Sequence, residues 1–319
     1  MSQFTDEPLH FRTPYRESPS LSKLTGLNVW LKFENGQPSG SFKIRGIGHM
    51  CQKCVLKGCK RLVCSSGGNA GMAAAYAARK LSAPITIFVP QTTSNLTVQN
   101  LKQEGAEVQV IGSVWDEAND AALEFTKQDG FVYVPPFDNP LLWEGHSSII
   151  KELDSKPDMV ICSVGGGGLL CGVVQGLQAC GWNDVPVLAV ETVGAHSFNE
   201  ALIAGHLVTL PGIASIAKSL GAKTVCQGTL EVAKEHPIIA CTVTDKDTVK
   251  SMSTFLDDEK VLVEPACAAS FAVLYNGQIN KLMQERVELK NVKKVAVIVC
   301  GGTQITIGQL NQWKKEFDV

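Results

Sequence analysis

Long apolar runs are missing from this sequence of 319 residues, and so is a strong excess of charge of either sign. No apolar run approaches the roughly 18 residues that a membrane-spanning helix needs. The start, Met1 to Glu7, lacks the basic-then-apolar order of a signal peptide. Lys and Arg total 29 against 31 Asp and Glu, which provides no electrostatic footprint for nucleic acid or an anionic membrane. We therefore expect a soluble, cytoplasmic protein that binds neither nucleic acid nor a membrane.

The 11 cysteines do not suggest a disulfide framework. Their number is odd, several lie in apolar strand-like runs, and a chain of this length does not need disulfides to fold. Reduced thiols are therefore expected. A zinc cluster is the alternative, because Cys51 and Cys54 are followed by Cys59 and Cys64. Cys64 ends a strand pattern and no matching Cys/His pair lies nearby, which disfavours the closed four-ligand site of structural zinc.

The length and the pattern of the chain predict an α/β protein of two domains. A hydrophobic fraction of 45% allows a sizeable core, and about 150 residues per domain gives two domains. A strand pattern at 28–33 comes first. Short β-branched runs then alternate with helical patterns over residues 62–128 and again over 159–319. Such alternation predicts two open, twisted parallel sheets covered by helices.

Two turn-rich segments set the expected domain boundaries. Residues 134–140 separate the two alternating series, and residues 35–40 separate the first series from the N-terminal strand. We expect residues 1–35 and 138–319 to form a large domain. Residues 36–137 would form a smaller α/β domain inserted into it.

Four consecutive glycines, Gly165 to Gly168, follow a strand pattern and precede a helical pattern at 169–180. Backbone amides at a helix N-terminus, without Cβ atoms to block approach, suit a phosphate group. A merely tight turn is the alternative. The run is not Gly-x-Gly-x-x-Gly, and Asp184 lies before the next strand rather than at its end, which disfavours a dinucleotide. It also lacks the Gly-Lys-Ser/Thr ending of a nucleoside-triphosphate loop.

Lys43 lies between a strand pattern and a helical pattern, with Ser41 placed as the N-cap. In the first turn of a helix the positive end of the macrodipole disfavours an ammonium group. The amine is then easier to deprotonate, as an imine-forming lysine must be. Taken alone, a first-turn lysine is more often an exposed surface residue.

Five segments together resemble the fold-type II pyridoxal-phosphate (PLP) enzymes, the tryptophan synthase β-like family. The segments are Ser39-Gly-Ser-Phe-Lys-Ile-Arg-Gly46, Cys64-Ser-Ser-Gly-Gly-Asn-Ala-Gly71, Trp143-Glu-Gly-His146, Ser163-Val-Gly-Gly-Gly-Gly168 and Val299-Cys-Gly-Gly302. They occur in the family's order, the similarity covers essentially the entire chain, and it is greatest to the L-serine/L-threonine dehydratases. The resemblance implies a homodimer that converts L-serine to pyruvate and ammonia, and L-threonine to 2-oxobutanoate and ammonia.

The resemblance also implies a role for each matching residue at the cofactor. Lys43 would carry PLP as a Schiff base, Phe42 would stack near the pyridine ring, and Asn69 would bond the 3-oxygen. The phosphate would be held by Gly165, Gly166, Gly167 and Gly168. The sulfur of Cys300 would face the pyridine nitrogen, where a neutral thiol does not keep N1 protonated and so favours elimination over transamination. Outside this family a buried structural cysteine would be the better interpretation of Cys300.

The segment from Ser65 to Asn69 follows a strand pattern and opens a helix. Hydroxyls and backbone amides at a helix start suit a carboxylate, so this loop is predicted to bind the substrate's α-carboxylate. Its members are Ser65, Ser66, Gly67, Gly68 and Asn69. A plain N-cap with a glycine turn is the alternative. The serine racemases of the family look to have a serine acid/base in place of Gly67, and because glycine cannot exchange a proton, we expect racemisation to be weak.

A cation site is implied around Glu191, since related dehydratases bind a cation in the matching stretch. The ligands would be the Glu191 carboxylate, an oxygen of Ser197 and the carbonyls of Ala195, Leu220 and Ala222. One carboxylate with several carbonyls suits a hard cation of low charge, so potassium is expected. An ordinary carboxylate at the end of a strand is the alternative, because structural ion pairs also explain such acids.

His146 and His196 invite a general-base assignment, because histidine titrates near neutrality. We assign the base to Lys43 instead, since the lysine freed by the substrate stands next to Cα. Rival activities within the family are a serine racemase, a threonine synthase and a synthase that replaces the β-substituent with sulfide. A catalytically silent PLP-binding protein is the rival from another class.

Overall fold

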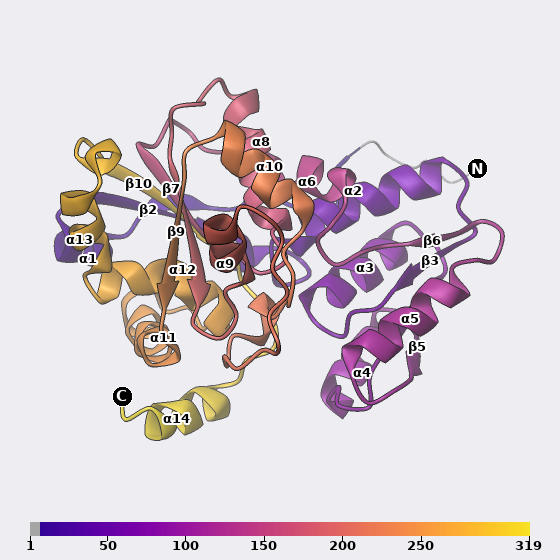
Figure 1. The fold of residues 1–319 in the computed structure, drawn as a ribbon. Helices are drawn as coiled ribbons and strands as arrows, with labels where there is room; N and C mark the ends of the chain where they lie inside the picture. The colour runs from indigo at the N-terminus through magenta and orange to yellow at the C-terminus, as the bar shows by residue number, and fades with distance from the viewer. Residues whose placement is uncertain (1–6) are drawn as a thin grey trace. The chain divides into compact units, whose positions relative to one another are not determined.

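The computed structural model describes residues 7–319, and the chain divides into two compact units. Unit 1 comprises Gln37–His146 and the described part of Met1–Phe11, and unit 2 comprises Arg12–Gly36 and Ser147–Val319. Each unit has its own largely parallel sheet with helices packed on it (Figure 1). This confirms the expected α/β fold class.

Unit 1 contains a four-stranded parallel sheet in the order β5-β4-β3-β6. Its strands are β3 (Arg61–Cys64), β4 (Ile85–Val89), β5 (Glu107–Val110) and β6 (Phe131–Tyr133). Its helices are α2 (Lys43–Leu56), α3 (Asn69–Lys80), α4 (Asn95–Gln103), α5 (Trp115–Phe125) and α6 (Pro140–His146).

Both faces of the unit 1 sheet are covered, because successive side chains of a strand point to opposite faces. Leu62 and Ile87 belong to a buried cluster with residues of α2 and α3. Val63 and Phe88 pack instead with Ala118 of α5. The inner strands β3 and β4 are therefore apolar at most positions, whereas the edge strand β5 alternates polar and apolar residues.

The start of α2 differs from the prediction in one respect. Lys43 is the first residue of the helix, as expected, but Phe42 is at the N-cap and Ser41 does not cap the helix. Phe42 has helical dihedral angles, φ -53° and ψ -20°, whereas an N-cap residue usually has extended ones, and no side chain makes a capping hydrogen bond. The Ser41 hydroxyl is buried and has no hydrogen-bond partner within residues 7–319.

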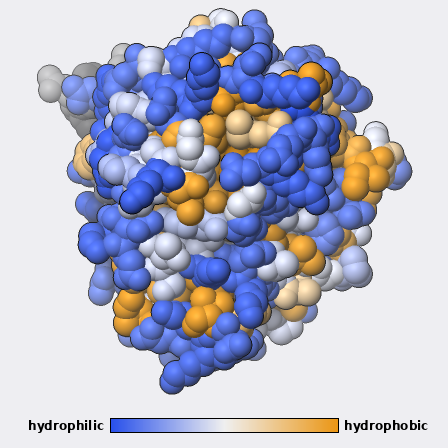
Figure 2. Space-filling model, turned by 90° about the vertical axis from the view of Figure 1, so that its left-hand side faces the viewer, coloured by the Kyte–Doolittle hydropathy of each residue, from blue (hydrophilic) through white to orange (hydrophobic). Residues whose placement is uncertain are grey.

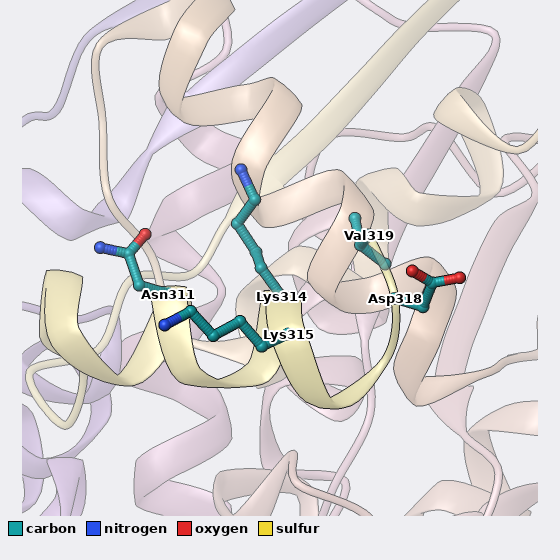
Figure 3. Close-up of a pocket in the computed structure, with 5 residues that line it drawn as sticks. All are labelled: Asn311, Lys314, Lys315, Asp318 and Val319. Carbon is teal, nitrogen blue, oxygen red and sulfur yellow. The ribbon is translucent and has the colours of Figure 1, made fainter.

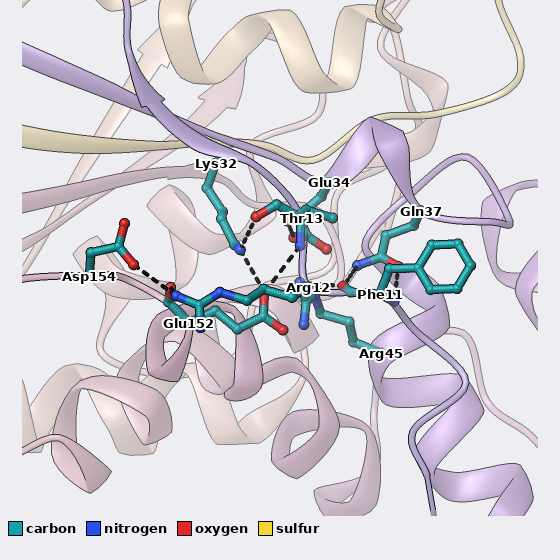
Figure 4. A network of polar contacts seen from close by, with 9 residues as sticks. All are labelled: Phe11, Arg12, Thr13, Lys32, Glu34, Gln37, Arg45, Glu152 and Asp154. Atoms are coloured by element: carbon teal, nitrogen blue, oxygen red, sulfur yellow. Dashed lines mark hydrogen bonds and ion pairs between the residues drawn. The ribbon is translucent and has the colours of Figure 1, made fainter.

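Unit 1 takes in residues that we expected in the large domain. Phe11 belongs to it because its backbone N–H and carbonyl bond the Gln37 amide, each at 2.9 Å, and the carbonyl also accepts from Arg45 Nη2 at 3.3 Å (Figure 4). Helix α6 belongs to it because it packs on α2, where a Cβ on Gly145 would lie 2.3 Å from the Arg45 carbonyl oxygen. The unit thus extends beyond the turn-rich segment that we took as its end.

Unit 2 contains a six-stranded sheet in the order β1-β2-β10-β7-β8-β9. Its strands are β1 (Tyr15–Glu17), β2 (Asn28–Phe33), β7 (Met159–Ser163), β8 (Val187–Thr192), β9 (Ile238–Val243) and β10 (Lys294–Val299). Its α-helices are α1 (Pro19–Thr25), α7 (Ser148–Lys151), α8 (Gly168–Ala179), α9 (Ser197–Ala204), α10 (Gln227–Glu235), α11 (Asp245–Glu259), α12 (Pro265–Tyr275), α13 (Gln278–Glu285) and α14 (Ile307–Glu316). Three short 3-10 turns are η1 (Glu34–Gly36), η2 (Lys218–Leu220) and η3 (Val287–Leu289).

The N-terminal strand joins the C-terminal sheet, as the sequence predicted. β2 pairs in parallel with β10, with Val29 opposite Val295 and Leu31 opposite Val297. Only β1, at the edge, runs antiparallel to its neighbour among the described strands. Helices α8 and α12 both pack on this sheet, and α12 is buried along most of its length.

A buried ionic network holds the first residues of unit 2 (Figure 4). Lys32 on β2 is fully buried, and its Nζ donates to the Thr13 carbonyl at 2.8 Å and to Glu152 Oε2 at 2.6 Å. Arg12 pairs with Asp154 at 2.8 Å in a more exposed position. Because a buried ammonium group without partners would be costly, this network fixes the segment after Phe11 within unit 2.

Hydrophilic side chains make up most of the molecular surface on the face drawn in Figure 2, with hydrophobic ones among them. Within residues 7–319 no helix is both long and apolar enough to span a bilayer.

Candidate active site

Lys43 is held at the start of α2 by contacts within unit 1. Its Nζ donates to the carbonyl of Pro136 and lies 5.2 Å from the centroid of the Phe42 ring. The Phe42 ring in turn contacts the His146 ring, with 4.9 Å between centroids. An amine at the positive end of a helix, beside an aromatic ring, is suited to bond an aromatic aldehyde.

His146 is a buried, neutral packing residue of α6. Burial, together with the nearby Lys43 and Arg45 charges, lowers its pKa well below the usual value of 6.5. The ring packs so closely on α2 that a Cβ on Gly46 would lie 2.6 Å from its Cε1. Neither ring nitrogen has a hydrogen-bond partner within the described part of the chain. This placement agrees with assigning the base to another residue.

His196 has a local role at the start of α9. Its Nδ1 accepts from the Gly194 N–H at 3.0 Å, and its Nε2 lies 3.4 Å from a carboxylate oxygen of Glu200. Both partners lie within four positions of His196 in the sequence, as expected of a structural histidine.

The predicted substrate loop begins with a buried serine. Ser65 is 0% exposed, and its Oγ donates to Asn119 Oδ1 at 2.8 Å and lies 2.7 Å from the Tyr133 hydroxyl. Tyr133 donates to the same Asn119 oxygen at 2.6 Å, and Trp115 Nε1 donates to the Ser65 carbonyl at 2.7 Å. We call Ser65, Asn119, Tyr133 and Trp115 the Ser65 network. Our sequence reasoning missed its last three members.

The rest of the loop turns tightly into α3. Ser66 Oγ accepts from the Gly68 N–H at 3.2 Å, and α3 begins at Asn69 without a capping side chain. Gly71 in the first turn is required to be glycine, because a Cβ there would lie 1.8 Å from the Ser66 carbonyl oxygen. The loop therefore lies directly over the N-terminus of α3, which is where backbone amides attract an anion.

The glycine run in unit 2 has a steric reason as well as an electrostatic one. A Cβ on Gly165 would lie 2.8 Å from Leu220 Cα, and a Cβ on Gly167 would lie 2.1 Å from Thr229 Cγ2. Gly167 also has φ +95°, a left-handed conformation that favours glycine, and it caps α8 without a side chain. A tight turn and an open helix N-terminus thus coexist here.

Cys300 follows β10 and is buried beside other polar groups of unit 2. Its Sγ lies 3.6 Å from Ser163 Oγ at the end of β7, and the next amide, Gly301 N–H, donates to Cys267 Sγ at 3.4 Å. All eleven cysteines are free thiols. Among residues 7–319, no group of three or more His, Cys, Asp or Glu side chains is arranged to hold a metal ion.

Glu264 is a buried carboxylate near this point that the sequence analysis missed. It accepts from Ser219 Oγ at 2.5 Å and from the Gln304 N–H at 2.7 Å, and a Cβ on Gly302 would lie 2.2 Å from its Cδ. It therefore joins the segment before Leu220 to the segment after Cys300. A Glu directly before Pro265, at a helix start, was the available signal.

Glu191 belongs to β8, and its carboxyl group is buried at the start of α9. Its two carboxylate oxygens accept from the Phe198 N–H at 3.0 Å and the Asn199 N–H at 2.7 Å. Burial raises its pKa to about 8, although these two bonds act in the opposite direction. Ser197 Oγ donates to the Ala222 carbonyl at 2.9 Å, so two of the five expected ligands are in direct contact.

A shallow surface pocket at the C-terminal helix contains none of the predicted site residues (Figure 3). It is lined by Asn311, Lys314, Lys315, Asp318 and Val319. Most of these side chains are exposed, and Lys314 Nζ is bonded to Ser253 Oγ at 2.9 Å. Nothing about this pocket indicates a ligand.

The predicted residues fall into two sets, one in each unit. Unit 1 brings together Lys43, Phe42 and the loop Ser65–Asn69, and unit 2 contains the glycine run, Cys300 and the Glu191 group. The chemistry of PLP fits these residues: a half-buried amine for its aldehyde, and for its phosphate a helix start without a capping side chain, in a turn where Gly165 and Gly167 leave no room for a Cβ.

Comparisons with known proteins agree with this chemistry. The model of a family described as pyridoxal-phosphate dependent enzyme matches residues 7–301. The L-serine dehydratase/L-threonine deaminase of Homo sapiens is 54% identical over 315 residues, 97% of this chain and 96% of that protein. A fungal L-serine ammonia-lyase from Rhizomucor miehei has a similar structure, with TM-score 0.91 and 37% identity, over 98% of this chain and 100% of that one. Maize serine racemase matches with TM-score 0.87 and 26% identity, over 97% and 93%. The chain therefore belongs to the pyridoxal-phosphate dependent enzyme family.

Proposed function

We propose that this protein converts L-serine to pyruvate and ammonia, and L-threonine to 2-oxobutanoate and ammonia. The observation that carries the proposal is the position of Lys43 at the first residue of α2, in a chain 54% identical to a protein named for both activities. The structural similarity to a fungal L-serine ammonia-lyase supports the same reaction.

Lys43 is the residue to which we assign the chemistry. Its Nζ would hold the cofactor through the aldehyde group, and we assign to the same amine the removal of the proton from the substrate's Cα. PLP, when bound, supplies a conjugated ring that withdraws electrons from Cα. The helix start favours the neutral form of the amine, which is the form that can accept a proton.

The other assigned residues bind and orient. We propose that the Gly165–Gly168 backbone binds the phosphate, that Phe42 stacks near the ring, and that Asn69 bonds the 3-oxygen. Cys300 would face the pyridine nitrogen as a neutral thiol. The loop Ser65–Asn69 would bind the substrate's carboxylate, because the start of α3 offers amides and no competing cap.

We further propose that a monovalent cation, potassium, binds at Glu191 with oxygens of Ala195, Ser197, Leu220 and Ala222. The burial of the Glu191 carboxyl group and the contact between Ser197 and Ala222 support this. We also propose a cytoplasmic homodimer, as the resemblance to the family implies. Sedimentation of the purified protein tests the dimer.

Replacing Lys43 tests the proposal directly. Lys43→Ala should abolish both the visible absorbance of bound cofactor and the release of ammonia from L-serine, because no other group is assigned to either role. The matched control is Lys53→Ala, an exposed lysine of the same helix, which should behave as wild type. Reduction with borohydride followed by peptide mass spectrometry should find the adduct on Lys43. A coloured, active Lys43→Ala protein would contradict the assignment.

The rival activities give different products. Gly67 has no side chain to exchange a proton, and a Cβ there would lie 3.0 Å from Thr93 Cγ2, which argues against racemisation. Measuring pyruvate, D-serine, and cysteine formed from O-acetylserine and sulfide separates a dehydratase from a racemase and a synthase. A measurement of turnover with L-serine distinguishes all three from a catalytically silent protein.

A further inference from the structure

The Ser65 network contains the first residue of the loop to which we assign carboxylate binding. All of its members belong to unit 1. Ser65 follows β3, Tyr133 ends β6, and β3 and β6 are paired with Val63 opposite Tyr133. Asn119 and Trp115 come from α5, which packs on the same sheet. Asn119 and Tyr133, which lie 54 and 68 positions from Ser65 in the sequence, therefore meet at its hydroxyl group.

The buried Ser65 hydroxyl makes its contacts with protein groups, the Asn119 amide and the Tyr133 hydroxyl. A serine hydroxyl has one proton, and Ser65 donates it to Asn119 Oδ1. That oxygen also accepts from Tyr133, so both of its lone pairs are used. Burial raises the pKa of Tyr133 to about 12, and its phenol stays a donor throughout the neutral range. Ser65 is thus fixed in position by side chains that come from β6 and α5.

Trp115 fixes the backbone of the same residue. Its indole N–H donates to the Ser65 carbonyl, and because the peptide group is planar, this also sets the orientation of the peptide that leads to Ser66. The Ser66 carbonyl oxygen then lies against Gly71 in the first turn of α3. A single residue, Ser66, therefore connects the Ser65 network to the first turn of α3.

We propose that Tyr133, Asn119 and Trp115 are positioning residues that hold the loop Ser65–Asn69 in the geometry that recognises the carboxylate of an α-amino acid. The inference rests on the proposed function of this loop. Ser65 then contributes through its position, and the direct contacts with the carboxylate fall to the rest of the loop.

Tyr133→Phe tests the proposal by removing one hydroxyl group. The KM for L-serine should rise about 10-fold, the worth of one hydrogen bond, while kcat changes less than about 3-fold and the absorbance of bound cofactor is unchanged. Trp115→Phe, at a residue that is 42% exposed, should fold normally and raise KM about 3-fold. The matched control is Tyr275→Phe, which removes a phenol bonded to Asp258 in unit 2 and should leave KM unchanged.

A double-mutant cycle separates positioning from a general loss of stability. Asn119→Leu and Tyr133→Phe act through the same serine, so the double variant should raise KM no more than about 2-fold beyond the larger single effect. Multiplied effects, an unchanged KM in Tyr133→Phe, or a loss of cofactor absorbance in that variant would each overturn the proposal. Binding of L-serine can be followed by the change in cofactor absorbance without turnover. A wild-type protein that binds L-serine but forms no pyruvate would refute the proposed function alone.

Discussion

The N-termini of α3 and α8 follow the same arrangement of strand, turn and helix, but different contacts hold the two turns. Each follows a buried parallel strand, β3 or β7, and each lacks a capping side chain. At α8 the turn is all glycine, and backbone crowding against Leu220 and Thr229 fixes its shape. At α3 the turn contains two serines, and side-chain hydrogen bonds from β6 and α5 fix it. The comparison teaches that a helix N-terminus can be prepared for an anion either by close backbone packing or by a polar network.

This difference matches the residence of the two proposed ligands. A cofactor phosphate stays bound through many turnovers, and a site made of backbone alone has few ways to change. A substrate carboxylate must enter and leave in each cycle. A loop held by exchangeable hydrogen bonds is suited to that, and we expect each site to fail in its own way when its support is removed.

The largest effect should come from crowding the α8 start. Gly167→Ala places a Cβ 2.1 Å from Thr229 Cγ2 at φ +95°, and we expect cofactor affinity to fall about 100-fold, with activity lost accordingly. Titration with PLP, followed by absorbance, measures this. The control is Gly181→Ala, which has φ +71° but nothing within 4 Å, and should cost only about 1 kcal/mol of stability. Wild-type cofactor affinity in Gly167→Ala would break the comparison.

A smaller effect, larger on the substrate than on the cofactor, should follow from crowding the α3 start, where Asn69 is the one residue that we assign to the cofactor. Gly71→Ala forces the Ser66 carbonyl oxygen away from a Cβ that would lie 1.8 Å from it, so the KM for L-serine should rise at least about 10-fold. Cofactor absorbance should remain. Gly308→Ala, in α14 with its nearest neighbour at 3.7 Å, is the control and should be neutral. Loss of the cofactor from Gly71→Ala would show that the two sites are not separate in function.

The smallest effect on turnover should come from a third helix start, α9, where the anion is the chain's own Glu191. Its pKa is about 8 when folded against 4.5 ordinarily, so the unfolded chain releases this proton first as the pH rises. The stability present below pH 4.5 is then lost progressively up to about pH 8. Glu191→Gln should remove this decline, and potassium should reduce it in wild type, because a bound cation favours the carboxylate.

Urea denaturation at pH 5, 6.5 and 8 measures this, in potassium chloride and in tetramethylammonium chloride. Glu191 is assigned to the binding of the cation and to no step of the reaction, so we expect Glu191→Gln in potassium to lose less activity than Gly167→Ala or Gly71→Ala. Equal pH dependence in wild type and Glu191→Gln would show that Glu191 does not titrate as described.

Much of the fold could be predicted from the spacing of apolar residues and from the turn residues between them. The runs at 62–64, 85–89 and 295–299 fall within strands of the structure, because apolar β-branched residues bounded by turns have few other places to go. The start of α2 at Lys43 was predicted within a residue. Ser41 was expected to cap it and does not, because its buried hydroxyl makes no hydrogen bond to the first turn of the helix.

What the sequence did not show depends on which strands become neighbours. Tyr133 reaches Ser65 only because β6 pairs with β3, and no local pattern encodes that order. Phe11 joins unit 1 through its bonds to the Gln37 side chain, a contact between residues 26 positions apart. The positions of Lys43 and of the glycine run at helix starts were predictable because each is a property of a single turn.

The place of β10 in the sheet has a consequence for synthesis on the ribosome. β10 lies between β2 and β7, so neither of those strands has its central partner until residues 294–299 have been translated. Unit 1 draws nearly all of its residues from Gln37–His146 and can fold long before that. In a nascent chain, Lys43 would thus lie on a folded unit while the glycine turn after β7 still lacks part of its sheet, and the cofactor site that we propose is complete only after the last strand has been added.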